Sequence, residues 1–113
     1  MNFSKETRSN TLIVRIAGDL IGEDIGTGLV DTVNEAIGHQ VLTCIIDISG
    51  IRYINSSGIG VLITVLTKFR NKGGEVYLMK PSESVKKLLV ITKLNAIFQV
   101  IQAEEEVLQD ARK

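Results

Sequence analysis

Two adjacent serines, Ser56 and Ser57, are the residues of this chain best placed to do chemistry. They lie in the stretch INSSGIG, residues 54–60, between an apolar turn and a long segment with helical apolar periodicity. A serine at such a boundary can cap the helix by accepting a hydrogen bond from a backbone N–H two or three residues further on. It can also carry a phosphate, because the positive end of the helix stabilises the added charge. One serine is enough for the cap, so the second hydroxyl is available for modification.

The glycines of this stretch have a structural interpretation. Gly58 and Gly60 are small enough to allow a tight turn from strand to helix and close packing of the helix. The sequence GIG at 58–60 matches part of a dinucleotide-binding fingerprint, but the third glycine is absent. The lysine of a phosphate-binding loop is absent as well. The stretch therefore does not predict a nucleotide site.

Other chemistries find little support in the sequence. The single histidine, His39, is expected at the solvated end of a helix, and no second histidine or reactive cysteine can pair with it. The single cysteine, Cys44, lies in an apolar run and is expected to be buried. No Cys/His spacing indicates zinc. Asp47 is expected to end a strand, as does the phosphoacceptor of a response-regulator receiver domain. A receiver domain also needs a pair of acidic residues after its first strand to hold magnesium, and here only Asp19 follows the first long strand, which weakens this interpretation. We expect no metal, no cofactor and no enzymatic activity.

Composition indicates one soluble domain over residues 1–113, with a core at about 11–101. Hydrophobic residues make up 44% and charged residues 23% of the chain, and thirteen acids balance thirteen bases. This balance favours neither nucleic acid nor an anionic membrane as a partner. The first ten residues lack the plan of a signal peptide, and no apolar run approaches the ~20 residues that span a bilayer. We expect a cytoplasmic protein.

Apolar periodicity alternates between the strand and the helix repeat along the chain. The segment at 11–18 reads as a strand, with residues 2–8 as an antiparallel partner across a turn at Ser9 and Asn10. The remaining segments predict strands at 41–48, 75–80 and 98–101, and helices at about 24–37, 57–71, 82–94 and 103–112. The segment at 41–48 is almost continuously apolar, which is typical of a central strand. The predicted fold class is α/β, a mixed β-sheet with helices packed on it.

The segment from Ile45 to Val100 resembles a known family. It reads IIDISGIRYINSSGIGVLITVLTKFRNKGGEVYLMKPSESVKKLLVITKLNAIFQV. It is similar to the signature half of the STAS-domain anti-sigma factor antagonists, in which an apolar strand ending in Asp precedes a turn. In that family Asp-Ser-Ser/Thr-Gly-Leu/Ile-Gly then opens a helix, and Gly-Gly precedes the next strand. The likeness extends from about Leu12 to Ile101, and the Ser-Ser-Gly-Ile-Gly core is its most specific part.

The resemblance implies a bacterial partner-switching protein. The unphosphorylated form would bind an anti-sigma factor that is also its serine kinase, and would thereby free the sigma factor. The phosphorylated form would release the kinase until a PP2C-type phosphatase resets it. The family phosphoacceptor corresponds here to Ser56, and Ser57 would stay unmodified and help to cap the helix. The implied surroundings of the phosphosite, which would also contact the partner, are Ile54, Asn55, Ser57, Gly58, Ile59 and Gly60.

The chain departs from the family pattern at two positions. Asn55 replaces the usual Asp before the serines, which removes a like charge beside a phosphate. Ile21 stands where the family often has an acid, and this weakens the expected partner surface there. The alternative function is a STAS scaffold or transporter-associated subunit that mediates assembly without a serine switch. A module that binds a nucleotide or another small molecule is a third possibility.

Overall fold

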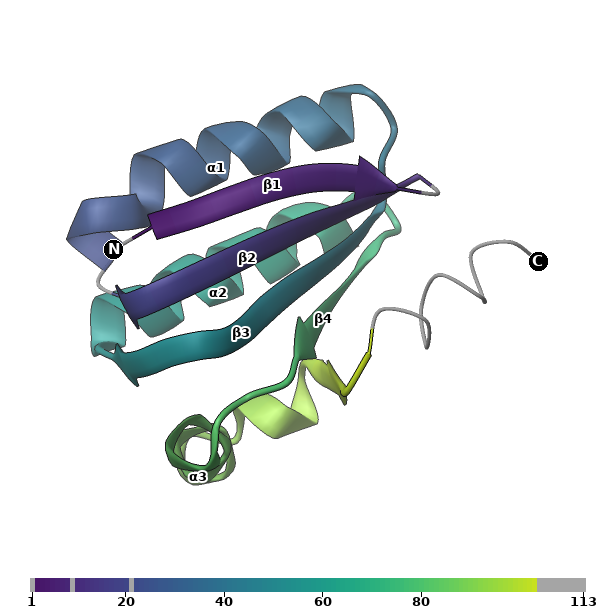
Figure 1. Ribbon diagram of the computed structural model, residues 1–113. Helices are drawn as coiled ribbons and strands as arrows, with labels where there is room; N and C mark the ends of the chain where they lie inside the picture. The colour runs from purple at the N-terminus through teal and green to yellow at the C-terminus, as the bar shows by residue number, and fades with distance from the viewer. Residues whose placement is uncertain (1, 9, 21, 104–113) are drawn as a thin grey trace.

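The computed structural model describes residues 2–8, 10–20 and 22–103, although the side chains of residue 2 and of residues 22–27 are not described (Figure 1). Three sequence-based expectations lie outside the described residues. These are the polar helix at 103–112 beyond Ala103, Ser9 of the predicted hairpin turn, and the position of Ile21. Among the described residues, no helix is long and apolar enough to cross a bilayer.

The architecture is a five-stranded sheet with strand order β1-β2-β3-β4-β5. β1 runs antiparallel to β2, and the other neighbouring strands are parallel, so the predicted mixed α/β sheet is confirmed. In chain order the elements are β1 (Asn2–Arg8), β2 (Thr11–Leu20), α1 (Gly22–Gly38), β3 (Thr43–Ile54), α2 (Ser56–Arg70), β4 (Glu75–Met79), α3 (Glu83–Ile91), the 3-10 turn η1 (Leu94–Ala96) and β5 (Gln99–Ile101).

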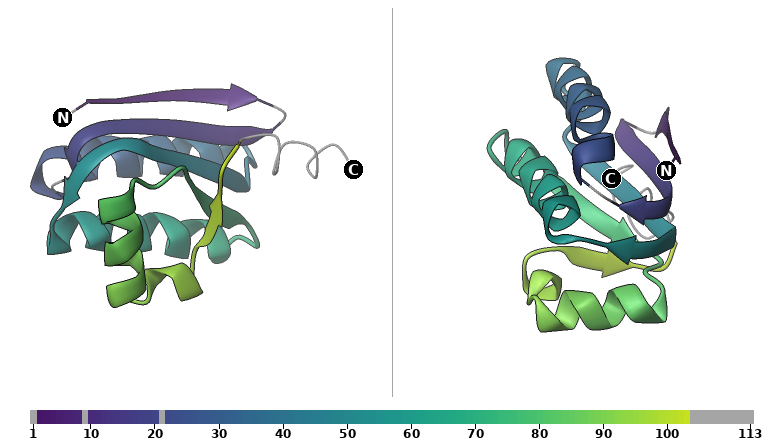
Figure 2. Two further views of the ribbon diagram at one scale, coloured as in Figure 1. Left: turned by 60° about the horizontal axis from the view of Figure 1, so that its bottom comes forward. Right: turned by 90° about the vertical axis from the view of Figure 1, so that its left-hand side faces the viewer.

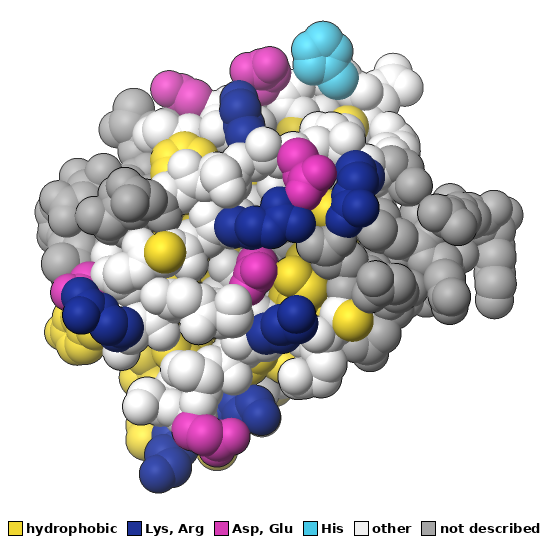
Figure 3. All heavy atoms as spheres, viewed as in Figure 1, with side chains coloured by type: hydrophobic (Ala, Val, Ile, Leu, Met, Phe, Trp, Pro, Cys, Tyr) yellow, Lys and Arg dark blue, Asp and Glu magenta, His cyan; other side chains and the backbone are white. Residues whose placement is uncertain are grey.

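The helices form a layer on one side of the sheet. α1 and α2 run next to each other along this face, and α3 crosses their direction near the β4–β5 side (Figures 1 and 2). The opposite face of the sheet is turned toward the viewer in Figure 3, where acidic and basic side chains are intermixed. The Arg15 guanidinium donates to the Glu6 carboxylate on adjacent strands, and this hydrogen bond lowers the pKa of Glu6.

Alternating side chains of the strands and one stripe of each helix build the core. Leu12, Val14 and Ile16 of β2 belong to the same buried cluster as alternate residues of β3. α2 contributes Leu62, Val65, Leu66 and Phe69 to this cluster, as the helical period predicted, while Ile59 packs against its margin. Leu29 and Val33 of α1 are also fully buried. The predicted stripes therefore face the sheet.

β3 is longer than the sequence predicted. We expected it to end at residue 48 and to be followed by a turn, but the strand continues to Ile54. β2 likewise extends to Leu20, and its register against β3 shifts between Arg15 and Ala17 and again between Gly18 and Asp19. Such irregularities let a strongly twisted pair of strands continue, and here they bury Ile51 and Ile54. Asp47 consequently lies in the middle of β3, and the expectation that it ends a strand was wrong.

The segment predicted as one helix at 82–94 divides in two. α3 ends at Ile91, and Lys93 adopts a left-handed conformation (φ 62°), which a helix cannot continue through. The short turn η1 follows and buries Leu94 before the chain enters β5. This break, which periodicity alone did not predict, creates a corner between α3 and β5.

Candidate functional site

The two serines begin α2 directly after the end of β3. The chain leaves β3 at Ile54, passes through Asn55 in an extended conformation (φ −93°, ψ 178°) and enters the helix at Ser56. The first turn of α2 consists of two serines, a glycine and an isoleucine, so it carries no charged side chain of its own. A helix start of this kind presents backbone N–H groups and the positive end of the helix dipole to the surface.

The residue that caps α2 is Asn55. Its Oδ1 accepts a hydrogen bond from the Gly58 N–H at 2.7 Å and another from the Ser57 hydroxyl at 3.0 Å. The expectation that one of the serines caps the helix was therefore wrong. The helix begins one residue earlier than predicted, which shifts the cap to Asn55, and asparagine caps as well as serine does. The identity of Asn55, three residues before Gly58, was the signal in the sequence that could have indicated this.

The cap gives the two hydroxyls different surroundings. The Ser57 hydroxyl donates to the Asn55 side chain, and Ser57 is half-buried. Ser56 is exposed to solvent at the first position of the helix. The structure therefore makes Ser56 the accessible hydroxyl, while Ser57 takes part in holding the turn.

Gly58 allows the start of α2 to lie against the end of β2. A Cβ atom at this position would lie 2.3 Å from the backbone oxygen of Leu20, which is closer than atoms approach in folded proteins. The same Leu20 oxygen accepts a hydrogen bond from the Asn55 N–H at 3.3 Å. By contrast, a Cβ atom at Gly60 would meet nothing within 4 Å. Gly58 therefore has a packing role that Gly60 does not share.

The expected site residues divide into an exposed and a buried group. Ser56 and Gly60 are exposed, and Asn55, Ser57 and Ile59 are half-buried. Ile54 and Gly58 are buried, so they pack beneath the site and offer little surface to a partner.

The end of β3 adds two exposed residues that the sequence reasoning did not single out. The Tyr53 side chain is 56% exposed, and the Arg52 guanidinium lies 3.7 Å from the Asp19 carboxylate on β2. A large aromatic residue left in solvent close to a candidate site is typical of a contact surface. Because β3 was expected to end earlier, these residues had been assigned to a turn.

The remaining reactive residues lie in other surroundings. Cys44 is fully buried in the central strand, and burial raises the pKa of its thiol far above the usual range. His39 is exposed beyond the C-terminal end of α1, as expected. Within the described part of the chain, no cluster of His, Cys, Asp and Glu side chains could hold a metal ion. The accessible chemistry of this site is therefore that of the Ser56 hydroxyl.

The model of the STAS domain family matches residues 2–107 of this sequence. This chain belongs to the STAS-domain family. The STAS domain is 27% identical over 66 residues to a Thermotoga maritima protein named as a candidate anti-sigma factor antagonist. That match spans 58% of this chain and 58% of the relative, so it covers little more than half of either protein.

Solved structures share the fold of this STAS domain. SpoIIAA of Bacillus in its phosphorylated form has a TM-score of 0.76 at 21% identity, covering 98% of this chain and 100% of that one. A sulfate transporter family protein from Wolinella succinogenes has a TM-score of 0.71 at 17% identity, covering 96% of this chain and 89% of that one. The same fold is thus found in SpoIIAA, which is described in its unphosphorylated form as an anti-sigma factor antagonist, and in a sulfate transporter family protein.

Proposed function

We propose that this STAS domain is a bacterial, cytoplasmic anti-sigma factor antagonist that is switched by phosphorylation of Ser56. The unphosphorylated domain binds an anti-sigma factor with serine kinase activity and so releases the sigma factor. Phosphorylation ends this binding, and a PP2C-type phosphatase restores it. The observation that carries the proposal is the exposed Ser56 hydroxyl at the start of α2, beside a second serine that is occupied by the Asn55 cap.

The physical basis of the switch is electrostatic. The side chains of the first turn of α2 are small and uncharged, so this turn can lie flat against a partner. A phosphate adds a charge of about −1.5 to −2. Burying that charge in an interface without a matching cation costs several kcal/mol, and each ~1.4 kcal/mol weakens binding tenfold. The helix dipole stabilises the same charge within the domain, so the fold itself is retained.

Asn55 suits this mechanism. It caps α2 with a neutral side chain directly beside Ser56, so no like charge repels the phosphate from this position. In this scheme the domain is a substrate and a binding partner. It supplies the hydroxyl that becomes phosphorylated, while the kinase supplies ATP and the catalytic base.

Phosphorylation by the cognate kinase tests the proposal, with Ser56→Ala and Ser57→Ala as a matched pair of variants. Mass spectrometry should place one phosphate on Ser56 in the natural sequence and in Ser57→Ala, and none on Ser56→Ala. Ser56→Ala should still bind the kinase, and Ser56→Asp should bind more weakly. A phosphate on another residue, or equal binding by Ser56→Asp, would contradict the proposed switch.

A scaffold without a serine switch is the second candidate. The likeness to the sulfate transporter family protein favours it, because that protein carries the same fold in a different context. A scaffold predicts that the Ala and Asp variants of Ser56 bind their partner equally well. The binding measurement described above therefore separates the two functions.

A further inference from the structure

Exposed apolar side chains gather near the C-terminal end of the described chain. Of the six large apolar side chains that the described residues expose, four belong to α3 and the segment that follows it, namely Val90, Ile91, Ile97 and Val100. Their exposed fractions range from 37% for Ile97 to 78% for Ile91. Exposed apolar side chains that lie together on a domain often mark a site of interaction.

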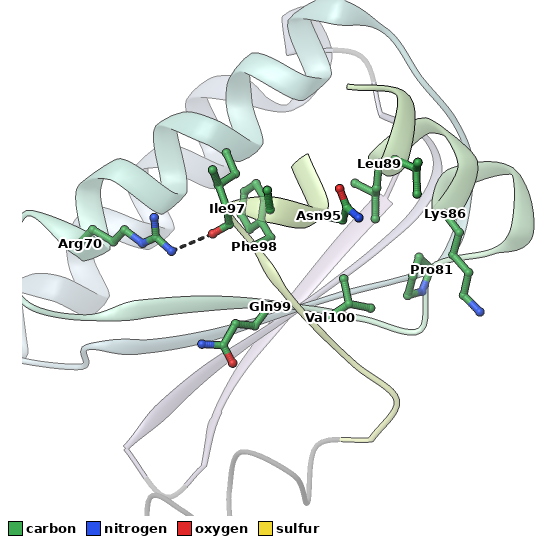
Figure 4. A pocket seen from close by; sticks show the side chains of 11 residues that line it. Arg70, Pro81, Lys86, Leu89, Asn95, Ile97, Phe98, Gln99 and Val100 are labelled. Carbon is green, nitrogen blue, oxygen red and sulfur yellow. Dashed lines mark hydrogen bonds between the residues drawn. The ribbon is translucent and has the colours of Figure 1, made fainter. Parts of the chain in front are cut away.

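Three of these residues line a hollow of about 620 Å³ between α3, η1, β5 and the end of α2 (Figure 4). Val90 enters it from α3, Ile97 from the end of η1, and Val100 from β5, while Asn95 and Gln99 add amide groups to the wall. Ile91, the next residue of α3, does not line the hollow. A concave apolar surface with a few polar groups is suited to receive protruding side chains.

One wall of the hollow is held in place by Arg70. Its guanidinium donates to the Ile97 carbonyl oxygen at 2.7 Å (Figure 4). It also donates to the Glu75 carboxylate at 3.1 Å. These contacts join the last residue of α2 to β4 and to the residue that follows η1, so the hollow is preformed. A preformed site binds with a smaller loss of conformational entropy than one that must be ordered first.

The lining of the hollow carries positive charge. Of the described side chains that line it, two are cationic, Arg70 and Lys86, and none is acidic. Lys87, the other lysine of α3, is exposed. Lys86 lines the hollow itself, next to Val90 on the same side of α3. A surface of this sign attracts acidic partners and disfavours basic ones.

We propose that this hollow docks an acidic amphipathic segment of a second protein. Apolar side chains of that segment contact Val90, Ile97 and Val100, and its carboxylates face the lysines of α3. A second copy of this chain is a poorer occupant, because like surfaces would bring the same positive charge together. A bilayer is poorer as well, because a flat surface does not reach into a hollow.

This docking surface is separate from the Ser56 surface. Ser56 and Arg70 are the first and last of the 15 residues of α2, which places them about 21 Å apart along the helix axis. The Debye length at physiological salt is about 8 Å, so a phosphate on Ser56 is screened from Arg70. The residues of α3 that lie beside Tyr53 and Ile54 line a different hollow and not the proposed docking surface. We therefore expect binding at the docking surface not to depend on the state of Ser56.

Nuclear magnetic resonance with two synthetic peptides tests the proposal on the full chain. One peptide is an amphipathic helix of about 18 residues, or five turns, with leucines on one face and glutamates on the other. Its matched peptide has every glutamate replaced by lysine. We expect the acidic peptide to shift the amide signals of Val90, Ile97 and Val100, and to leave those of Ser56 and Gly60 unchanged. The basic peptide should shift none of them.

Variants identify the groups responsible. Val90→Asp should weaken binding of the acidic peptide by about tenfold or more, since it removes an apolar contact and adds a like charge. Ile91→Asp places the same charge on the same helix outside the hollow and should change the affinity by less than about threefold. Lys86→Glu should weaken binding of the acidic peptide and strengthen binding of the basic peptide. Ser56→Asp should leave both affinities unchanged, and thermal unfolding checks that each variant is folded.

Several results would overturn the proposal. These are no shift with the acidic peptide at millimolar concentration, equal binding of both peptides, or equal losses in Val90→Asp and Ile91→Asp. Sedimentation equilibrium showing a dimer that Val90→Asp disrupts would assign the hollow to a second copy instead. Binding to phosphatidylserine vesicles that Val90→Asp abolishes would assign it to a membrane surface.

Discussion

Asn55 determines how the two serines of this domain differ. Its side-chain oxygen accepts hydrogen bonds from both the Gly58 N–H and the Ser57 hydroxyl. The Ser57 hydroxyl is therefore engaged in the turn, while Ser56 is exposed. Neither of these hydrogen bonds involves Ser56. The selectivity proposed for the phosphosite is a consequence of helix capping.

Substitution of Asn55 should change stability in a graded way. Asn55→Ala removes the cap and should lower the free energy of unfolding by about 0.5–2 kcal/mol. Asn55→Asp keeps an acceptor and adds a negative charge at the positive end of α2, so it should retain or raise stability by about 0.3–1 kcal/mol. Urea unfolding of the three proteins gives the comparison. Equal stability of the Ala and Asp variants would mean that the Asn55 side chain does not cap the helix.

The two glycines of the site form a second comparison at the residue scale. Gly58→Ala places a Cβ against the Leu20 backbone oxygen and should cost about 1–3 kcal/mol, because the start of α2 must move away from β2. Gly60→Ala meets open space and should raise stability by up to about 1 kcal/mol through helix propensity. Thermal unfolding measures both. A neutral Gly58→Ala would show that α2 does not approach β2 as closely as described.

At the scale of elements, α2 connects the serine site to the core. Its inner side is fully buried against the sheet, while its first turn reaches the surface at Ser56. A well-packed helix holds the phosphosite in one place, so that modification changes charge without rearranging the fold. α3 has the opposite character, because it is short and leaves Val90 and Ile91 exposed.

The stability lost when side chains of α2 are changed to Ala should follow this burial pattern. Leu62 and Leu66 are 0% and 4% exposed, and each change to Ala should cost about 2–5 kcal/mol. Ile63 is the matched control on the outer side, 38% exposed, and Ile63→Ala should cost about 1 kcal/mol or less. A denaturant series checks the three variants together. Costs under half a kcal/mol for both leucines, or equal costs for all three, would contradict the packing of α2.

At the scale of the whole molecule, the central strand β3 joins the two halves of the sheet. It pairs with β2 on one side and with β4 on the other, and Cys44 lies within it at 0% exposure. A side chain in this position becomes accessible only when most of the domain opens. Cys44 is therefore a natural reporter of global unfolding.

Labelling of Cys44 by a thiol reagent should follow the global stability. In the native protein the reaction should be slow, because burial raises the pKa of the thiol and excludes the reagent. Leu62→Ala should accelerate labelling by about 30-fold or more, since each ~1.4 kcal/mol of lost stability raises the open population tenfold. Ile63→Ala should change the labelling rate little. Native labelling as fast as that of free cysteine would show that β3 opens locally.

The sequence by itself determined the elements and the family of this protein. The alternation of strand and helix periods, the antiparallel first pair and the continuously apolar central segment predicted the mixed sheet. The apolar period of the segment at 57–71 predicted the helix α2 and its buried stripe, and the Ser-Ser-Gly-Ile-Gly stretch indicated the STAS family. These features are local, because the apolar repeat of a strand (two residues) or of a helix (3.6 residues) can be seen in consecutive side chains.

Only the tertiary structure decided where those elements end and what lies beside them. β3 continues to Ile54 because the irregular register of β2 keeps the two strands paired, and this in turn makes Asn55 the cap of α2. The hollow likewise combines Arg70, Val90 and Val100 from three elements that are separated in the sequence. Strand length, capping and neighbouring surfaces depend on long-range contacts, and hydrophobic periodicity contains no information about which distant residue supplies them.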